Sequence, residues 1–166
     1  KPYPVAVCVH GSDNWSGHHH EHILNFLENG IAVFRVHSFD SRGVASTAED
    51  QLAVTAAMMM VDAVEPLKFL SRHPDIDPKR IGITGWSLGG IVAFYSAWEP
   101  IMEILAPEGE RFCAHLPIYP ATFLQPDEHR WSKAPILSLV GEVDDYTPAS
   151  LVKDLTKQMQ ENGCLL

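Results

Sequence analysis

The sequence has little positive charge. Its 166 residues include 12 lysines and arginines against 21 aspartates and glutamates, which gives a formal net charge of -9. The basic residues also form no block along the chain. Nucleic acids and anionic membrane surfaces both attract clusters of basic side chains. The sequence therefore predicts neither nucleic acid nor a membrane as a partner.

Long hydrophobic runs and cysteines are also scarce. The apolar stretches are too short or too interrupted to span a bilayer, and the first residues show no signal-peptide pattern. The three cysteines, Cys8, Cys113 and Cys164, are odd in number and widely spaced. They predict neither a disulfide framework nor a metal site, and Cys8 is interpreted as a small buried apolar residue.

An initiating methionine is absent as well. The chain begins at Lys1-Pro2-Tyr3-Pro4 and ends at Cys164-Leu165-Leu166, which resembles the opening of a strand. We interpret the sequence as an internal piece of a longer protein, truncated at both ends. Cytoplasmic and exported locations both stay open, as does the oligomeric state.

The sequence does contain alternating strand and helix patterns. Short apolar or β-branched runs predict strands at 5–10, 31–36, 81–84, 114–119 and 135–141. Helices are predicted at 18–28, from a Ser46 and Glu49 capping-box pattern to about 73, at 91–98, and from 148 to 163. Residues 100–110 are predicted to be an irregular insertion, and 122–134 a polar loop. The alternation predicts an α/β fold with a mostly parallel sheet and helices on both faces, in one domain over 1–166.

The second of these helices is the longest. Apolar residues follow one another at helical spacing along it: Leu52, Ala56, Met59, Ala63, Leu67 and Leu70. Pro66 lies inside the same stretch and is expected to kink or divide the helix.

The chemistry centres on the segment that joins the third strand to its helix. Gly85-Trp86-Ser87-Leu88-Gly89 fits the Gly-x-Ser-x-Gly nucleophile elbow, in which a serine occupies a strained strand-to-helix turn. Glycines flank it because a Cβ would crowd the neighbouring strand or helix. The turn presents the Ser87 hydroxyl in a cleft at the carboxyl end of the sheet. We predict that Ser87 is a nucleophile.

Two further loops follow strands that end at the same edge. His10-Gly11-Ser12 follows the first strand, and we predict that the N–H of Ser12, or of Asp13 as the alternative, stabilises an oxyanion together with the N–H of Leu88. His10 is interpreted as a loop histidine that hydrogen-bonds the backbone, not as the general base. The segment 141–148 follows the last complete strand. Asp144 is our candidate acid there, and Asp145 is the runner-up.

Taken together, these segments resemble the dienelactone hydrolase family of α/β-hydrolases. The resemblance is carried by His10-Gly11-Ser12, Asp40-Ser41-Arg42-Gly43-Val44 with 46–51, Gly85 to Gly90, and Gly141 to Pro148, in family order. It implies an α/β-hydrolase fold and assigns the acid to Asp144. The best-known members use cysteine as the nucleophile, so Ser87 places the chain nearer the serine-bearing esterases. All nine histidines precede Asp144, and the resemblance implies that the catalytic histidine lies beyond Leu166.

Other candidates carry two interpretations each. Trp86 either lines the acyl pocket or packs beneath the serine. Arg42 either orients a substrate carboxylate or orders its loop through a salt bridge. The cluster His18, His19, His20 and His22 is interpreted as structural or solvated, because no matching ligand set accompanies it.

The predicted function is hydrolysis of a small-molecule carboxylic ester, or a lactone or thioester, through an acyl-enzyme on Ser87. No cofactor or metal is predicted. Two alternatives stay open: a peptidase or acyltransferase on the same scaffold, and a non-catalytic binding protein that retains the elbow.

Overall fold

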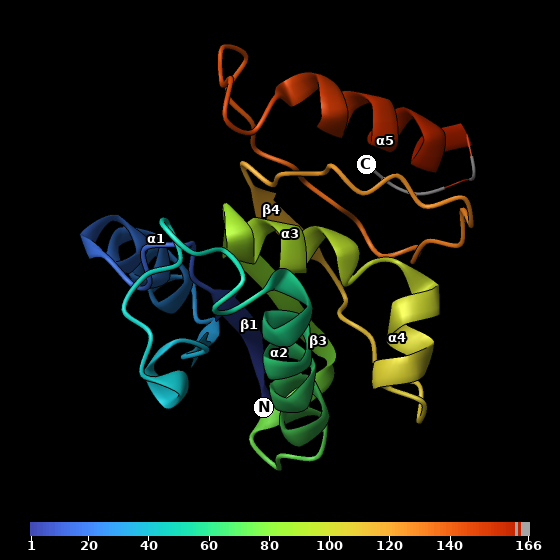
Figure 1. Ribbon diagram of the computed structural model, residues 1–166. Helices are drawn as coiled ribbons and strands as arrows, with labels where there is room; N and C mark the ends of the chain where they lie inside the picture. Colours follow the sequence, from blue (N-terminus) through green and yellow to red (C-terminus); the bar gives the residue numbers. More distant parts are fainter. Residues whose placement is uncertain (162, 164–166) are drawn as a thin grey trace.

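The computed structural model describes residues 1–161 and 163. Its centre is a sheet of four parallel strands in the order β2-β1-β3-β4 (Figure 1). The strands are β1 (Tyr3–Val9), β2 (Ala32–Val36), β3 (Ile76–Trp86) and β4 (His115–Ile118). The four strands match four of those predicted from the apolar runs.

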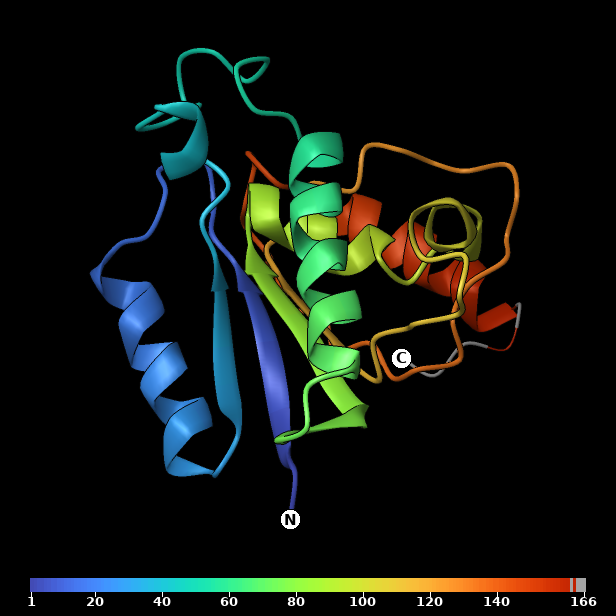
Figure 2. The ribbon, with the colours of Figure 1, turned by 90° about the horizontal axis from the view of Figure 1, so that it is seen from below.

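Helices cover both faces of the sheet (Figure 2). On one face lies α1 (Gly17–Glu28), and the opposite face carries α2 (Ala56–Ser71) and α3 (Leu88–Tyr95). Two further helices, α4 (Glu99–Leu105) and α5 (Ala149–Glu161), lie on the side of α3, and a short 3-10 turn, Asp40–Arg42, follows β2. The predicted parallel sheet with helices on both faces is confirmed.

Burial explains why the central strands are apolar along their whole length. Val5 to Val9 of β1 are all buried, because both faces of this strand are covered. The larger core packs α2, α3 and α5 against the sheet, and a smaller one, which includes Cys8, Ile23 and Trp86, lies under α1. Both cores therefore meet at β1 and β3, the strands that lead to the candidate site.

The predicted strand at 135–141 runs beside β4 without forming a regular strand. Isolated parallel bridges join His115 to Ile136 and Ile118 to Leu139. Backbone hydrogen bonds, among them Tyr119 N–H to Leu139 O at 2.7 Å, connect the same two segments. The segment thus takes the fifth position in the sheet order and delivers the loop 141–148 to the carboxyl edge.

The predicted start of the second helix is wrong. The helix begins at Ala56, where the Thr55 hydroxyl accepts a hydrogen bond from the Met58 N–H, and residues 46–55 form turns. Ser46 instead donates its hydroxyl to Asp13, and the N–H of the next residue bonds Ser12 O. Ser46 Oγ also accepts from the Ala48 N–H at 3.0 Å, so Ser46 forms a local turn and contacts a distant loop instead of starting the helix. The helix also runs past Pro66 without division.

The predicted irregular insertion at 100–110 is also wrong in its first half. Glu99–Leu105 forms α4, with Pro100 in its first turn, where a missing N–H costs nothing. Residues 122–134 form a loop, as predicted, apart from one bridge between Trp98 and Trp131. The strand expected to open at Cys164 lies outside the described residues.

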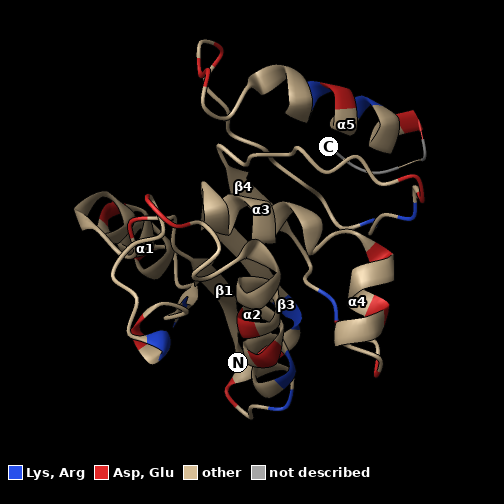
Figure 3. Cartoon of the chain, in the orientation of Figure 1, with Lys and Arg blue, Asp and Glu red and all other residues tan. Residues whose placement is uncertain are grey.

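Charged residues of both signs lie close together along some segments of the chain (Figure 3). Figure 3 shows acidic and basic residues alternating along α5 and meeting at the start of β3. Within residues 1–161 and 163, no helix has the length and apolar character that crossing a membrane requires.

The backbone of α3 lies very close to the ends of β1 and β3. A Cβ added to Gly89 would lie 2.2 Å from Val9 O and 2.5 Å from His10 O, and one added to Gly85 would lie 2.0 Å from Gly89 O. Real Cβ atoms do not approach backbone so closely. Both glycines are therefore required for the helix to begin directly against the sheet.

Gly89→Ala is predicted to destabilise the protein by about 2 kcal/mol or more, because backbone on two elements must move to admit the methyl group. The matched control is Gly17→Ala at the first position of α1, where an added Cβ meets nothing within 4 Å. Its unfolding free energy should stay within about 0.5 kcal/mol of wild type in urea denaturation. Equal stability of the two variants would contradict this packing.

Candidate active site

Ser87 occupies the strained corner between β3 and α3. Its backbone has φ 52° and ψ −111°, outside the regions that a residue with a Cβ normally adopts. Its N–H donates to Ile118 O at the end of β4, at 3.0 Å, and its carbonyl accepts from the Ile91 N–H at 3.0 Å. The neighbouring backbone thus holds the serine in this conformation, as the elbow motif predicts.

Ser87 lines a pocket of about 230 Å³. Its walls come from the loop after β1, the turns before α2, the start of α3, the loop after β4 and the loop before α5. The lining residues are Ser12, Gln51, Ser87, Leu88, Ile91, Ala121, Phe123, Tyr146 and Thr147. The carboxyl ends of the parallel strands therefore converge on one cleft, as they do in open α/β sheets.

The two predicted oxyanion donors both lie at this pocket. Leu88 is the first residue of α3, so its N–H has no acceptor within the helix. In the described part of the chain, the Ser12 N–H donates to no other group, whereas the Ser12 carbonyl accepts from the Thr47 N–H at 2.9 Å. The alternative donor, Asp13, does not line the pocket, and its carboxylate accepts the Ser46 hydroxyl.

Asp144 lies in a turn that borders the same pocket. Its Oδ1 accepts from the N–H groups of Tyr146 and Thr147, at 3.0 and 2.8 Å, and its Oδ2 accepts the Thr147 hydroxyl at 2.7 Å. These donations from the Thr147 N–H, the Thr147 hydroxyl and the Tyr146 N–H lower the pKa of Asp144. Asp145, the runner-up, is exposed. Asp144 is thus the carboxylate fixed in place and held ionised.

Several residues that line the pocket were not predicted from the sequence. Gln51, Phe123 and Tyr146 come from loops whose convergence depends on the tertiary fold, and Gln51 donates to the Tyr146 hydroxyl at 3.2 Å across the pocket. No local pattern identifies them. Thr147 did carry a signal, because an acidic residue three positions before a threonine is typical of a side-chain-capped turn.

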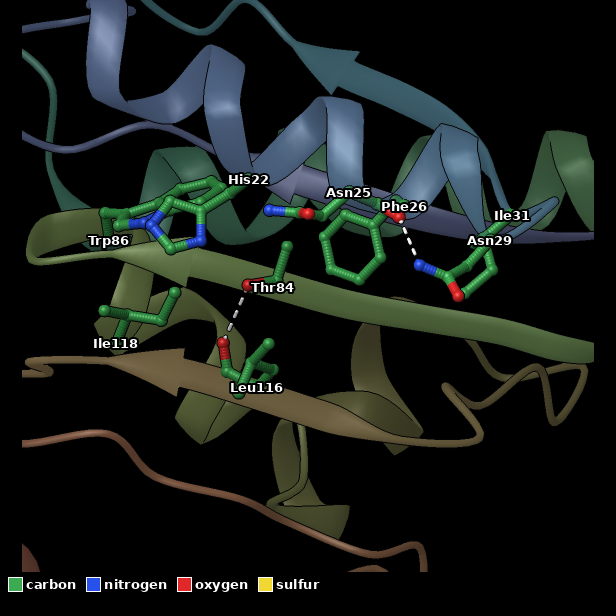
Figure 4. A pocket seen from close by; sticks show the side chains of 9 residues that line it. All are labelled: His22, Asn25, Phe26, Asn29, Ile31, Thr84, Trp86, Leu116 and Ile118. Carbon is green, nitrogen blue, oxygen red and sulfur yellow. Dashed lines mark hydrogen bonds between the residues drawn. The ribbon is translucent and has the colours of Figure 1, made fainter.

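Trp86 lies on the other face of the sheet. Its ring is buried beneath α1, where it contacts His19 and His22, with ring centroids 4.7 and 5.7 Å away. Figure 4 shows Trp86 beside His22, with Ile118 below them, along a second pocket of about 270 Å³. Trp86 therefore packs between the sheet and α1 and does not line the Ser87 pocket.

Arg42 is not brought to the Ser87 pocket. Its guanidinium binds both carboxylate oxygens of Asp62 on α2, at 2.7 and 3.0 Å, and donates to Ser38 O at 2.6 Å. This ion pair raises the pKa of Arg42, mainly through the hydrogen bond to Asp62. The Arg42 side chain thus joins its own loop to α2, and it does not line the Ser87 pocket.

None of the histidines in the described chain lines the Ser87 pocket. His19 is buried under Trp86, and burial lowers its pKa to about 4, so it is neutral near pH 7. Within the described residues, no three His, Cys, Asp or Glu side chains are grouped to hold a metal ion.

Comparison with known proteins agrees with this geometry. The sequence model of the dienelactone hydrolase family matches residues 33–166. The chain belongs to the dienelactone hydrolase family. This match contains three of the four segments on which the resemblance was based: residues 40–51, the elbow and the Asp144 turn.

A curated relative from Bradyrhizobium sp., named a "probable 2-oxo-3-(5-oxofuran-2-ylidene)propanoate lactonase", is 26% identical over 136 residues, which is 76% of this chain and 53% of the relative. The chain thus spans about half the length of that curated family relative. Apo Thermogutta terrifontis esterase 2 superposes with a TM-score of 0.74 at 18% identity, over 99% of this chain and 70% of that chain. A lipase/esterase from Lactobacillus plantarum gives 0.67 at 16%, over 99% and 78%. These structures confirm the α/β-hydrolase fold.

Thr147→Val is predicted to raise the pKa of Asp144, because one of the three donors that favour the carboxylate is removed while the shape is kept. In wild type the carboxyl should titrate below the ordinary aspartate value of 3.8. The native state thus loses this contribution to stability only as pH falls from that value through the lowered pKa. Side-chain carboxyl NMR measures both midpoints, and identical midpoints in the two proteins would contradict the assigned contacts.

Proposed function

We propose that the protein is a serine hydrolase that cleaves carboxylic esters, including lactones and thioesters, through an acyl-enzyme on Ser87. The observation that supports this most is the convergence of the strained Ser87 with two N–H groups, of Ser12 and Leu88, at one pocket. A nucleophile next to two fixed donors is what acyl transfer needs, since negative charge develops on the carbonyl oxygen during attack.

In the proposed reaction the Ser87 oxygen attacks the ester carbonyl and its proton passes to a histidine base. The N–H groups of Ser12 and Leu88 stabilise the oxyanion. The tetrahedral intermediate then expels the alcohol, which takes the proton from the histidine, and water releases the acid in a second, equivalent attack. Asp144 orients the base and stabilises its charged form. No histidine in the described residues lines the pocket, so the proposed base comes from outside them, as the family order implies.

The proposed substrates are uncharged around the carbonyl and have a short acyl group. None of the described residues lining the pocket carries a charge, and Phe123, Ile91 and Ala121 contribute apolar surface. The volume of about 230 Å³ is below the range typical of pockets for drug-sized ligands. Arg42, the cation that the sequence offered for a substrate carboxylate, does not line this pocket and is paired with Asp62.

Ser87→Ala in the full-length protein is predicted to lower kcat for p-nitrophenyl acetate at least about 10³-fold, because the acyl-enzyme cannot form. The matched control is Ser71→Ala at the end of α2, whose hydroxyl donates to Leu67 O and does not line the Ser87 pocket. It should keep the wild-type rate. Full activity in Ser87→Ala would refute the proposed mechanism, and inactivity of the wild type toward all three ester classes would favour the non-catalytic alternative.

The substrate proposal is tested with two esters of nearly equal size. We predict that kcat/KM for p-nitrophenyl butyrate exceeds that for the p-nitrophenyl monoester of succinate at least about tenfold. The free carboxylate of the succinate ester would lose its hydration in the pocket without gaining a cationic partner. Equal or faster turnover of the succinate ester would show that a cation reaches the acyl group, and would contradict the neutral pocket.

A further inference from the structure

In the loop after β1, neighbouring donors fix the position of one backbone carbonyl, that of Gly11. Gly11 O accepts two hydrogen bonds, from the His10 ring nitrogen Nδ1 at 2.8 Å and from the Asn14 N–H at 3.1 Å. Gly11 itself lies against the elbow, since a Cβ there would be 3.1 Å from Trp86 O. The peptide between Gly11 and Ser12 is therefore fixed beside Ser87.

We propose that His10 is a positioning residue for the oxyanion hole: by holding the Gly11 carbonyl, it aims the Ser12 N–H at the reacting carbonyl oxygen. The inference rests on the proposed function, because it assigns a role within the same site. The two groups belong to one planar trans peptide, in which C=O and N–H point in opposite directions. Fixing the carbonyl on the side of His10 thus fixes the N–H on the other side.

The surroundings of His10 make its Nδ1 a hydrogen-bond donor. Its side chain is fully buried, with its ring centroid 4.4 Å from that of Phe39 and 5.7 Å from that of Trp15. Burial lowers the pKa of His10 and keeps the ring neutral, so it carries a single N–H. A carbonyl can only accept, which places that hydrogen on Nδ1. The other nitrogen, Nε2, is buried and has no hydrogen-bond partner among residues 1–161 and 163.

Further hydrogen bonds hold the rest of this loop in place. Asn14 adopts a left-handed conformation, φ 62°, and its side chain donates to Asp40 at 3.0 Å and accepts from the Trp15 N–H at 2.8 Å. Trp15 in turn donates its indole N–H to Val36 O at 3.0 Å, and the Arg35 guanidinium lies 4.4 Å from its ring centre. The turn that returns the Asn14 N–H to Gly11 O is thus anchored to the end of β2.

Electrostatic stabilisation of an oxyanion depends on donors that are oriented before the reaction begins. A Ser12 N–H free to rotate away would have to be ordered in the transition state. The bond from His10 should therefore affect kcat far more than KM, because ground-state binding does not require that orientation.

The test compares two substitutions at this position in the full-length protein. His10→Leu keeps an apolar side chain between Phe39 and Trp15 and removes the donor. His10→Asn restores an N–H at the place of Nδ1, since both nitrogens are bonded to Cγ. With p-nitrophenyl acetate, His10→Leu should lower kcat about tenfold or more, part of the roughly 10²–10³-fold effect of losing a whole donor, and change KM less than about twofold. His10→Asn should recover most of the loss.

His115→Leu is the matched control. His115 is also buried, and its Nδ1 also contacts a backbone carbonyl, Ala93 O at 3.1 Å, away from the Ser87 pocket. It should lose stability but keep the wild-type kcat. Wild-type kcat in His10→Leu, or no recovery in His10→Asn, would overturn the positioning role. Retained activity in Ser87→Ala would instead overturn the proposed function, so the two failures differ.

A measurement on the wild type covers the case in which His10→Leu does not fold. Nitrogen-15 NMR of the histidine rings reports which ring nitrogen bears hydrogen. We expect the neutral Nδ1–H form for His10. A hydrogen on Nε2 would remove the bond to Gly11 O and refute the proposal without any variant.

Discussion

The close approach of α3 to the ends of β1 and β3 is the constraint on which the site depends. It is possible only because Gly85 and Gly89 lack side chains that would otherwise lie 2.0 to 2.5 Å from backbone atoms. With the helix this close, the chain must turn sharply between them, and Ser87 takes a positive φ of 52°. The packing of a whole layer maintains the strain, which is why so strained a backbone conformation can persist.

The same contact brings the candidate machinery together. The helix start places the Leu88 N–H at the pocket, and the end of β1, against which Gly89 packs, continues directly into the Gly11–Ser12 peptide. The segment 135–141, which lies beside β4 in the fifth position of the sheet, then leads to the Asp144 turn at the same edge. Each group is supported by backbone hydrogen bonds, so the site is oriented before any substrate arrives. That preorganisation is the physical basis of acyl transfer in the proposed function.

The sequence predicted those parts that depend on local patterns. Strands with continuous apolar runs, the elbow and the parallel architecture are confirmed, because burial on both faces dictates residue type directly. The start of α2 was misplaced because Ser46 binds Asp13 from a distant loop. The side of the sheet on which Trp86 lies, the pairing of Arg42 with Asp62, and the pocket roles of Gln51 and Tyr146 could not be predicted for the same reason. Each depends on contacts between segments far apart in the sequence.

The most direct test is a crystal structure of the full-length protein after reaction with a fluorophosphonate. We expect phosphorus bonded to the Ser87 oxygen, with one phosphonyl oxygen about 3 Å from the N–H groups of both Ser12 and Leu88. Modification of another residue would contradict the proposed mechanism, and so would an adduct on Ser87 whose oxygens face away from both N–H groups.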